Sequence, residues 1–199
     1  MNEKRNKLLY HITALDNLKS IFEFGLLSRS DVLSHNLLQK NVADETIIKK
    51  RKELRIIQYI PFHFFEKTAF TGAVYNSHPK TTFCVIAIRR SLAELNNFLI
   101  CTAHPLSENP VARILPYKTG FDAIDWVSLE KRDYSDERSK NAGMAECLAT
   151  SPISPLSFQS IAVPNEKIKE WVLSLAMSKF GYCPFFIDIK PEITQAGQI

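Results

Sequence analysis

The sequence has little glycine and no segment typical of a common nucleotide-binding or membrane architecture. There are only 6 glycines among 199 residues, and none of them forms a Gly-rich phosphate loop. A nucleotide would therefore not be held as it is in a Rossmann domain. No apolar run approaches the length needed to cross a bilayer, so we expect no membrane-spanning segment.

Cysteines are few and widely separated. The 4 cysteines each lie in or beside an apolar segment, at Cys84, Cys101, Cys147 and Cys183. No Cys-x-x-Cys pair or Cys/His cluster has the spacing of a metal site. Because isolated cysteines in apolar surroundings are usually buried thiols, we expect free cysteines, no metal and a reducing, cytoplasmic location.

The composition is that of a globular protein with a small positive charge. Hydrophobic residues make up 45% of the chain and charged residues 23%, and the formal net charge is +4. A charge of this size permits an anionic partner without demanding one. The length predicts one domain, with room for a small appendage at most.

Helical and extended patterns follow one another irregularly along the chain. Helical patterns cover residues 15–25, 43–55, 122–131 and 166–179. Extended apolar patterns cover residues 56–65, 83–88, 98–102, 142–149, 159–163 and 185–189, and residues 28–38, 103–120 and 133–141 are expected to be connections. Pro61 predicts that 56–65 is an edge strand or ends in a bend. Without regular βαβ alternation, this order favours an α+β fold with a largely antiparallel, curved or split sheet.

Residues 9–27 join a short apolar strand to an amphipathic helix. Thr13 fits the N-cap of that helix, Asp16 supplies the acidic third position of a capping box, and Gly25 is placed to end it. The backbone N–H groups at such a strand-to-helix junction suit a polar or anionic ligand. The segment around His11 is therefore a candidate ligand site.

Three further features leave their interpretation open. Glu146 lies among Ala, Cys and Leu, so it either faces solvent from a packed strand or lines a site. The basic run at residues 49–55 is either a solvated helix face or a helix that sends one cation into a cleft while the others meet a polyanion. His63 points away from the side of Phe62 and Phe64, toward solvent or a cleft, and we do not expect it to be catalytic.

Three segments of the chain form a recognisable set. They are Tyr10-His11-Ile12-Thr13 with Asp16-Asn17-Leu18 and Gly25-Leu26; Ile48 to Arg51 followed by Ile60 to Phe64; and Asp125-Trp126 through Arg132-Asp133-Tyr134 to Met144-Ala145-Glu146-Cys147-Leu148. The first segment resembles the opening motif of ADP-ribosyltransferases and RNA 2′-phosphotransferases, and the three together resemble the DarT family of DNA ADP-ribosyltransferase toxins. The resemblance implies an ADP-ribosyltransferase-like split, mostly antiparallel sheet with surrounding helices. NAD would lie in the cleft between its halves. It also implies a single domain over residues 1–199, with a core at about 8–165 and an added C-terminal helix and strand at 166–199.

The same resemblance assigns roles to individual residues. It implies that His11, Ile12 and Thr13 hold the nicotinamide end of NAD, largely through the backbone. It implies that Arg51 binds NAD and is catalytic, and that Glu146 is the catalytic glutamate. Lys50, Lys52 and Arg55 are within reach of a slipped alignment and stay alternatives to Arg51.

The loop at residues 133–141 would recognise the DNA. Tyr134, Arg138 and Lys140 are the expected strand contacts, through stacking and phosphate pairing. Asn141, Ala142 and Gly143 stand where other family members are more basic, so guanine stays open beside thymine as the modified base.

The implied function is transfer of ADP-ribose from NAD to a base of single-stranded DNA, with release of nicotinamide. The chain would then be a toxin paired with a macrodomain antitoxin of the DarG type. The alternatives are an RNA 2′-phosphotransferase-like or protein-directed ADP-ribosyltransferase, and a non-catalytic nucleic-acid-binding domain in which Glu146 merely faces outward.

Overall fold

A computed structural model describes residues 7–37, 45–106 and 113–193 of the chain. Its strands are β1 (Leu8–Ala14), β2 (Ile60–His63), β3 (Phe83–Arg89), β4 (Leu99–Cys101), β5 (Ile114–Pro116), β6 (Glu146–Ala149), β7 (Ser160–Val163) and β8 (Phe186–Ile189). Its α-helices are α1 (Leu18–Phe24), α2 (Arg29–Ser34), α3 (Glu45–Glu53), α4 (Ala69–Ser77), α5 (Arg90–Leu95), α6 (Tyr117–Ala123), α7 (Trp126–Lys131), α8 (Glu137–Ala142) and α9 (Glu166–Phe180). Short 3₁₀ turns are η2 (Leu15–Asn17), η3 (Pro155–Ser157) and η4 (Pro191–Ile193).

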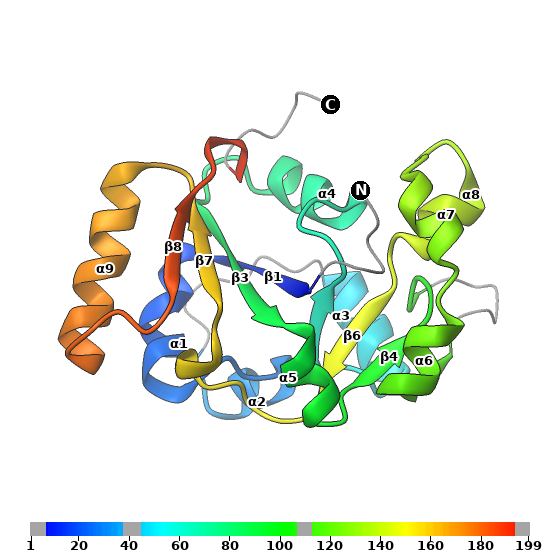
Figure 1. Ribbon diagram of the computed structural model, residues 1–199, viewed down its shortest axis with the longest axis horizontal. Helices are drawn as coiled ribbons and strands as arrows, with labels where there is room; N and C mark the ends of the chain where they lie inside the picture. The colour runs from blue at the N-terminus through cyan, green and yellow to red at the C-terminus, as the bar shows by residue number, and fades with distance from the viewer. Residues whose placement is uncertain (1–6, 38–44, 107–112, 194–199) are drawn as a thin grey trace.

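The strands form one twisted sheet in the order β5-β4-β6-β2-β1-β3-β7-β8 (Figure 1). All neighbouring strands pair antiparallel except β7 and β8, which are parallel. The predicted α+β fold with a mostly antiparallel sheet is therefore confirmed.

The sheet divides between its two central strands. β1 is paired with β3 along its whole length, from Leu8↔Arg89 to Ala14↔Phe83, whereas β1 and β2 share the single pair Tyr10↔His63 within the described residues. The strands on either side of this junction are thus two halves, β5-β4-β6-β2 and β1-β3-β7-β8. The predicted split of the sheet lies at this junction.

Pro61 was expected to mark an edge strand or a strand that ends in a bend. The strand does end in a bend, at residues 64–66, but β2 is an interior strand between β6 and β1 and not an edge. The carbonyl of Pro61 faces β1, because it accepts a hydrogen bond from the His11 ring at 2.8 Å. The N–H and C=O of a strand residue point to the same side, so the donor that proline lacks would also have faced β1. The proline is tolerated because β1 has already separated from β2 at this point.

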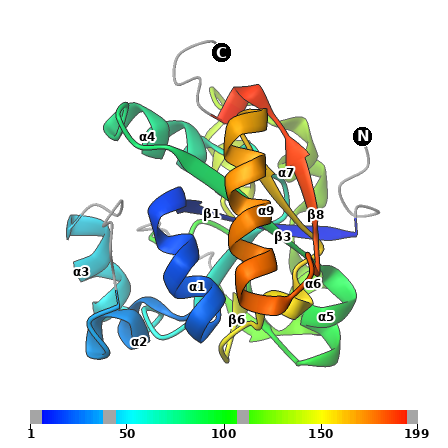
Figure 2. The ribbon, with the colours of Figure 1, turned by 90° about the vertical axis from the view of Figure 1, so that its left-hand side faces the viewer.

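Helices cover both halves of the sheet. The longest helix, α9, lies across β7 and β8 and beside α1 (Figure 2), where Phe22 packs against the rings of Phe180 and Phe185 with centroids 5.5 Å apart. On the other half, Phe64, which directly follows β2, packs edge-on against Trp126 of α7, with ring centroids 5.3 Å apart. None of the helices in the described part of the chain is long and apolar enough to span a membrane.

The predicted capping of the first helix is wrong in detail. Thr13 stays in β1, and the chain makes the turn η2 before α1 begins at Leu18 with Asn17 at its N-cap. The hydroxyl oxygen of Thr13 instead accepts a hydrogen bond from the Asn17 side chain at 3.2 Å. Gly25 ends the helix with φ of 86°, as predicted, because glycine adopts positive φ without steric cost.

Polar segments contain more helix than the sequence predicts. The expected single helix at 122–131 is the end of α6 and the whole of α7, separated by Ile124 and Asp125; Asp125 caps α7 by accepting from the Ser128 N–H. The expected loop at 133–141 contains α8, and the connection at 28–38 contains α2. Residues 38, 43, 44 and 107–112 of the predicted connections and basic helix lie outside the described residues.

Replacing glycine by alanine should have opposite effects on stability at two helical positions. A Cβ at Gly120 of α6 would lie 2.5 Å from the Ile100 Cβ in β4, whereas a Cβ at Gly72 of α4 would meet nothing within 4 Å. We expect Gly120→Ala to lower the free energy of unfolding by about 1–3 kcal/mol through overpacking. Gly72→Ala should leave it unchanged or raise it by about 0.5–1 kcal/mol, because alanine favours helix. Urea unfolding of both variants tests this, and equal effects would contradict the packing of α6 on β4.

Candidate active site

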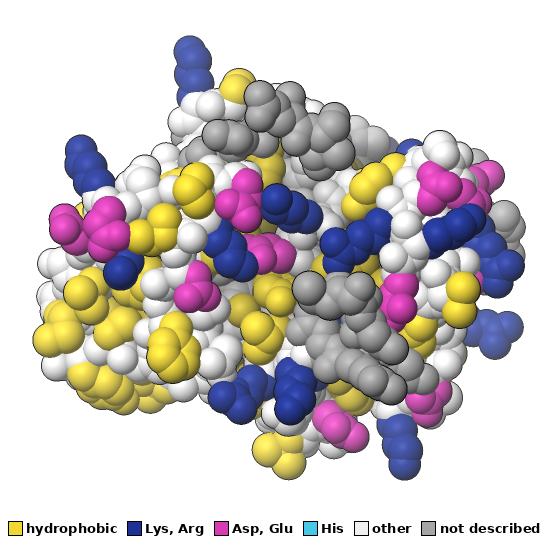
Figure 3. Space-filling view, turned by 45° about the horizontal axis from the view of Figure 1, so that its top comes forward, with side chains coloured by type: hydrophobic (Ala, Val, Ile, Leu, Met, Phe, Trp, Pro, Cys, Tyr) yellow, Lys and Arg dark blue, Asp and Glu magenta, His cyan; other side chains and the backbone are white. Residues whose placement is uncertain are grey.

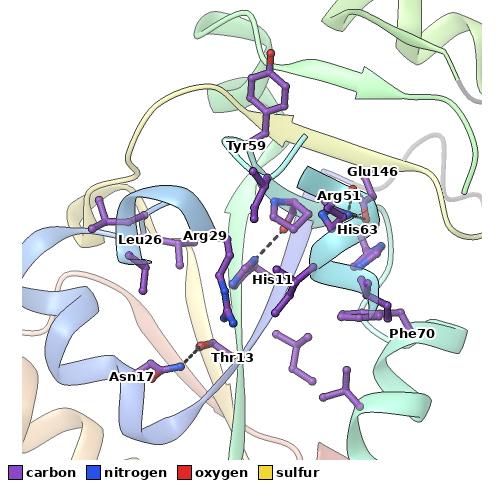
Figure 4. Close-up of a pocket in the computed structure, with 18 of the residues that line it drawn as sticks. His11, Thr13, Asn17, Leu26, Arg29, Arg51, Tyr59, His63, Phe70 and Glu146 are labelled. Atoms are coloured by element: carbon purple, nitrogen blue, oxygen red, sulfur yellow. Dashed lines mark hydrogen bonds and ion pairs between the residues drawn. The ribbon is translucent and has the colours of Figure 1, made fainter. Parts of the chain in front are cut away.

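A cavity of about 580 Å³ opens where the sheet divides (Figure 4). Its walls come from β1, β2, β6 and the helices α1 to α4, and it has the size of a typical small-molecule site. All five residues that the sequence assigns to NAD binding or catalysis line it: His11, Ile12, Thr13, Arg51 and Glu146. Segments separated by up to 135 positions are thereby brought to one hollow.

An ion pair between Arg51 and Glu146 lies in the wall of this cavity. Nη1 of Arg51 donates to both carboxylate oxygens of Glu146, at 2.9 and 3.0 Å, and the two side chains are 15% and 5% exposed. A buried carboxylate is costly unless it is paired, so Arg51 explains how Glu146 can sit among apolar neighbours. Glu146 therefore lines a site rather than facing solvent.

The position of Arg51 settles which cation of the basic run enters the cleft. The side chains of Lys50, Lys52 and Arg55 are exposed to solvent. Arg55 lies beyond the end of α3, in a turn where its φ is 55°. Of these candidates, Arg51 is the one that faces the cavity.

His11 joins the two halves of the sheet. Its Nδ1 lies 2.8 Å from the Pro61 carbonyl, so the ring donates from Nδ1 and crosses from β1 to β2. Burial lowers the pKa of His11 from 6.5 to about 4, against a smaller upward effect of the bond to Pro61. The ring is therefore neutral at pH 7, with Nε2 as an acceptor.

Arg29 is a cavity residue that sequence reasoning missed. It begins α2, whose N-cap Ser28 accepts from the Asp31 N–H at 3.2 Å, and its side chain extends toward Thr13 (Figure 4). Burial lowers the pKa of Arg29 from its very high ordinary value, and the group stays cationic. The Ser-Arg-Ser-Asp sequence at 28–31 carries a capping signal that could have revealed this helix.

His63 faces the cavity, which resolves the choice between solvent and cleft. Its strand pairs directly with β6 at His63↔Glu146, and the ring packs against Phe70 of α4 with centroids 5.4 Å apart. Burial lowers the pKa of His63, so this imidazole is also neutral at pH 7. Its neighbours Phe62 and Phe64 point into the core, as strand alternation predicts.

The three predicted DNA contacts lie outside the cavity. Tyr134 precedes α8, and Arg138 and Lys140 lie on it; all three are exposed and none is among the described residues that line the hollow. Nε of Arg138 donates to Asp125 at 2.8 Å. On the face shown in Figure 3, basic and acidic side chains are interspersed over the end of the molecule formed by α7 and α8.

The described residues hold no cluster of three or more His, Cys, Asp or Glu side chains that could bind a metal. All four cysteines are free thiols, as predicted, and burial raises the pKa of Cys84, Cys101 and Cys147. These thiols are packing groups rather than nucleophiles at pH 7.

The lowered pKa of His11 predicts a loss of stability in acid. The unfolded chain binds a proton at His11 near pH 6.5 and the folded chain near pH 4, so stability falls as the pH drops through this interval. The full contribution is up to about 3 kcal/mol. His11→Asn keeps a donor for Pro61 but cannot be protonated, so its free energy of unfolding should change less between pH 7 and pH 4. Equal pH dependence in parent and variant would contradict a buried, neutral His11.

Comparison with known proteins places this geometry in a family. The sequence profile of the family described as "ssDNA thymidine ADP-ribosyltransferase, DarT" matches residues 10–194. A DNA ADP-ribosyl transferase–DNA ADP-ribosyl glycohydrolase fusion protein of Thermosipho africanus is 25% identical over 175 residues. That match covers 82% of this chain but 44% of the fusion protein, so the chain spans less than half of that relative.

Solved structures share the fold. DarT of Thermus sp. 2.9 in complex with ADP-ribosylated ssDNA superimposes with a TM-score of 0.80 at 19% identity, over 95% of this chain and 96% of that one. The same protein in complex with NAD+ gives a TM-score of 0.76 at 17% identity, over 96% and 98% of the two chains. With the profile matched over nearly its whole length, the chain belongs to the DarT family of ssDNA thymidine ADP-ribosyltransferases.

Proposed function

We propose that this chain transfers ADP-ribose from NAD to a thymine of single-stranded DNA and releases nicotinamide. The observation that carries the proposal is the buried pair of Arg51 and Glu146, which shares one cavity with the His11-Ile12-Thr13 segment. The structures of Thermus sp. 2.9 DarT in complex with NAD+ and with ADP-ribosylated ssDNA support it.

NAD would lie along β1 and reach Glu146. The segment from His11 to Thr13 borders the division of the sheet, where β1 carries backbone groups that β2 does not pair, and these groups suit the nicotinamide end. Arg29 supplies a partly buried positive charge on the same side of the cavity, which suits the NAD diphosphate.

The chemistry requires stabilisation of a positively charged sugar. Breaking the nicotinamide glycosidic bond builds oxocarbenium character on the ribose, which a carboxylate stabilises through a ribose hydroxyl. Glu146 is a buried carboxylate at the cavity wall, held in place through both oxygens by Arg51. Nicotinamide is a good leaving group, so neither a metal nor a covalent nucleophile is needed.

A single strand is the expected form of the DNA, because an unpaired base enters a cleft without the cost of unstacking a duplex. Tyr134, Arg138 and Lys140 would contact the strand from the surface around α8, which leads through Met144 to Glu146. Arg138 would have to exchange Asp125 for a phosphate.

The fused relative supports a proposal for the biological setting. The Thermosipho africanus protein joins a DNA ADP-ribosyl transferase to a DNA ADP-ribosyl glycohydrolase. We infer that this chain is a cytoplasmic toxin. A macrodomain antitoxin of the DarG type would remove the ADP-ribose that it attaches to DNA. We also propose that its residues act as a single domain, with α9 and β8 packed onto the catalytic core.

Variants of the ion pair test the enzyme assignment. The parent chain, given NAD and a thymine-containing single-stranded oligonucleotide, should add the mass of one ADP-ribose, and the matched duplex should react far less. Glu146→Gln and Arg51→Ala should each lower the rate by about 10²–10³. Arg55→Ala is the matched control, because its side chain is exposed outside the cavity.

Several outcomes would contradict this assignment. Full activity of Glu146→Gln in a folded protein would remove the catalytic role of the carboxylate. A larger defect at Arg55 than at Arg51 would show that another cation acts on NAD. Modification of guanine in preference to thymine, or of RNA or protein in place of DNA, would replace the proposed substrate.

Arg29 predicts a separable defect in NAD binding. Removing its charge with Arg29→Gln should raise KM for NAD by about 10-fold to 100-fold, equivalent to about 1.4–2.7 kcal/mol of lost binding, with a smaller effect on kcat. Lys52→Gln removes an exposed positive charge from α3 and should leave KM for NAD unchanged. Steady-state kinetics at saturating DNA measure both. Equal KM values in the two variants would rule out a specific contact from Arg29.

A further inference from the structure

Two buried polar atoms beside Glu146 have no hydrogen-bond partner within the described residues. They are Nη2 of Arg51, a donor, and Nδ1 of His63. Arg51 pairs with Glu146 through its other terminal nitrogen, and His63 lies opposite Glu146 across the β2–β6 ladder. Figure 4 shows the three side chains in one corner of the cavity. An unpaired buried polar atom costs about 1–3 kcal/mol, which points to a ligand that completes both bonds.

The hydrogen bonding of His63 fixes the role of its free nitrogen. The ring bonds to the Ala145 backbone, and since Nδ1 has no partner, this bond uses Nε2. The bond raises the pKa of the ring, as expected where a ring N–H donates to a carbonyl, so we assign the proton to Nε2. Because the imidazole is neutral, Nδ1 then carries a lone pair. The corner of the cavity therefore offers one acceptor, on His63, and one donor, on Arg51.

A donor and an acceptor in the same corner of the cavity match a particular kind of base edge. Thymine presents a ring N–H flanked by carbonyls, and guanine presents a ring N–H beside one carbonyl. Cytosine and adenine present the reverse, a ring nitrogen with a lone pair beside an amino group. The corner formed by Arg51 and His63 complements the edges of thymine and guanine. With cytosine or adenine it would place donor against donor and acceptor against acceptor.

We propose that Nδ1 of His63 accepts the ring N–H of the target base and takes its proton, while Nη2 of Arg51 donates to the neighbouring carbonyl. This inference rests on the proposed transfer of ADP-ribose to thymine and assigns the proton of that reaction. Glu146, whose two oxygens are both held by Arg51, is left to stabilise the ribose.

The step balances in atoms and charge. The N–H bond of the base breaks and its proton joins Nδ1 of His63, while the electron pair of the ring nitrogen forms the new bond to the ribose C1 atom. The bond from that carbon to nicotinamide breaks, and its electron pair stays on the nicotinamide nitrogen. One positive charge thus moves from the pyridinium ring to the imidazolium, which later gives its proton to water.

The surroundings of His63 suit a proton acceptor that is neutral before the reaction. The charged and titratable groups around it are Glu146 on β6, Arg51 on α3, His11 on β1 and His104 in the segment after β4. Glu146 favours the imidazolium, whereas burial and Arg51 oppose it. Phe70 holds the ring plane from the side of α4.

Two substitutions separate this role from a structural one. His63→Gln can still donate to the Ala145 carbonyl from the position of Nε2 but offers no lone pair at Nδ1. His63→Asn can present a carbonyl oxygen near Nδ1, yet an amide does not take a proton. Both should lower the single-turnover rate on a thymine oligonucleotide by about 10²-fold to 10³-fold.

The diagnostic measurement uses 5-fluorouracil in place of the target thymine, because its ring N–H is more acidic. The defect of both variants should shrink at least 10-fold on this oligonucleotide, since a more acidic base depends less on a proton acceptor. His35→Gln changes an exposed histidine at the C-terminal end of α2, outside the cavity, and should match the parent on both oligonucleotides.

Each result has a distinct meaning. Equal defects on thymine and 5-fluorouracil would show that His63 acts only by supporting the fold, and no defect on thymine would exclude it from the reaction; both overturn the inference and leave the proposed function standing. A parent chain that modifies neither oligonucleotide would overturn the proposed function, and this inference with it.

Discussion

The ion pair between Arg51 and Glu146 is the interaction on which the site depends. It joins a helix and a strand 95 positions apart in the sequence and gives a partner to a carboxylate that is buried among Ala, Cys and Leu. The same bonds fix the direction of the carboxylate relative to the cavity. A group that stabilises a short-lived cation must be oriented before the reaction begins, and the two hydrogen bonds from Nη1 of Arg51 provide that orientation.

The cavity itself results from incomplete strand pairing. β1 pairs along its whole length with β3, and β2 pairs along its whole length with β6. β1 and β2 can therefore share one residue pair while each half of the sheet stays intact. Pro61 fits this junction because it lacks the donor that a continued ladder would need. His11 restores a single bond across the opening with its side chain. The opening is thus built into the backbone rather than formed by loops.

The sequence predicted helices and strands correctly where the pattern of apolar residues alone decides the structure. The buried run that forms β3 and the amphipathic face of α9 were both found from periodicity. It was incomplete where tertiary context decides: the strand of Pro61 ends in a bend as expected, but it lies inside the sheet, because an adjacent strand departs there. α8 forms in a polar segment whose N-cap, Asp136, supplies local support without an apolar face. Arg29 was missed because a single arginine has no periodic signal, whereas Arg51 and Glu146 were found through the family resemblance.

The exposure of α3 has a consequence for any inactive mutant. No residue of this helix is buried, so its attachment to the body of the protein relies on a few contacts, among them the guanidinium of Arg51. Replacing Glu146 by a neutral residue removes the reactive carboxylate. It also removes the ion pair that attaches α3, which forms one side of the cavity, to β6. A crystal structure of an inactive Glu146 variant with both substrates bound could therefore show α3 in a displaced position. A slowly reacting substrate analogue bound to the unaltered chain would keep α3 in place.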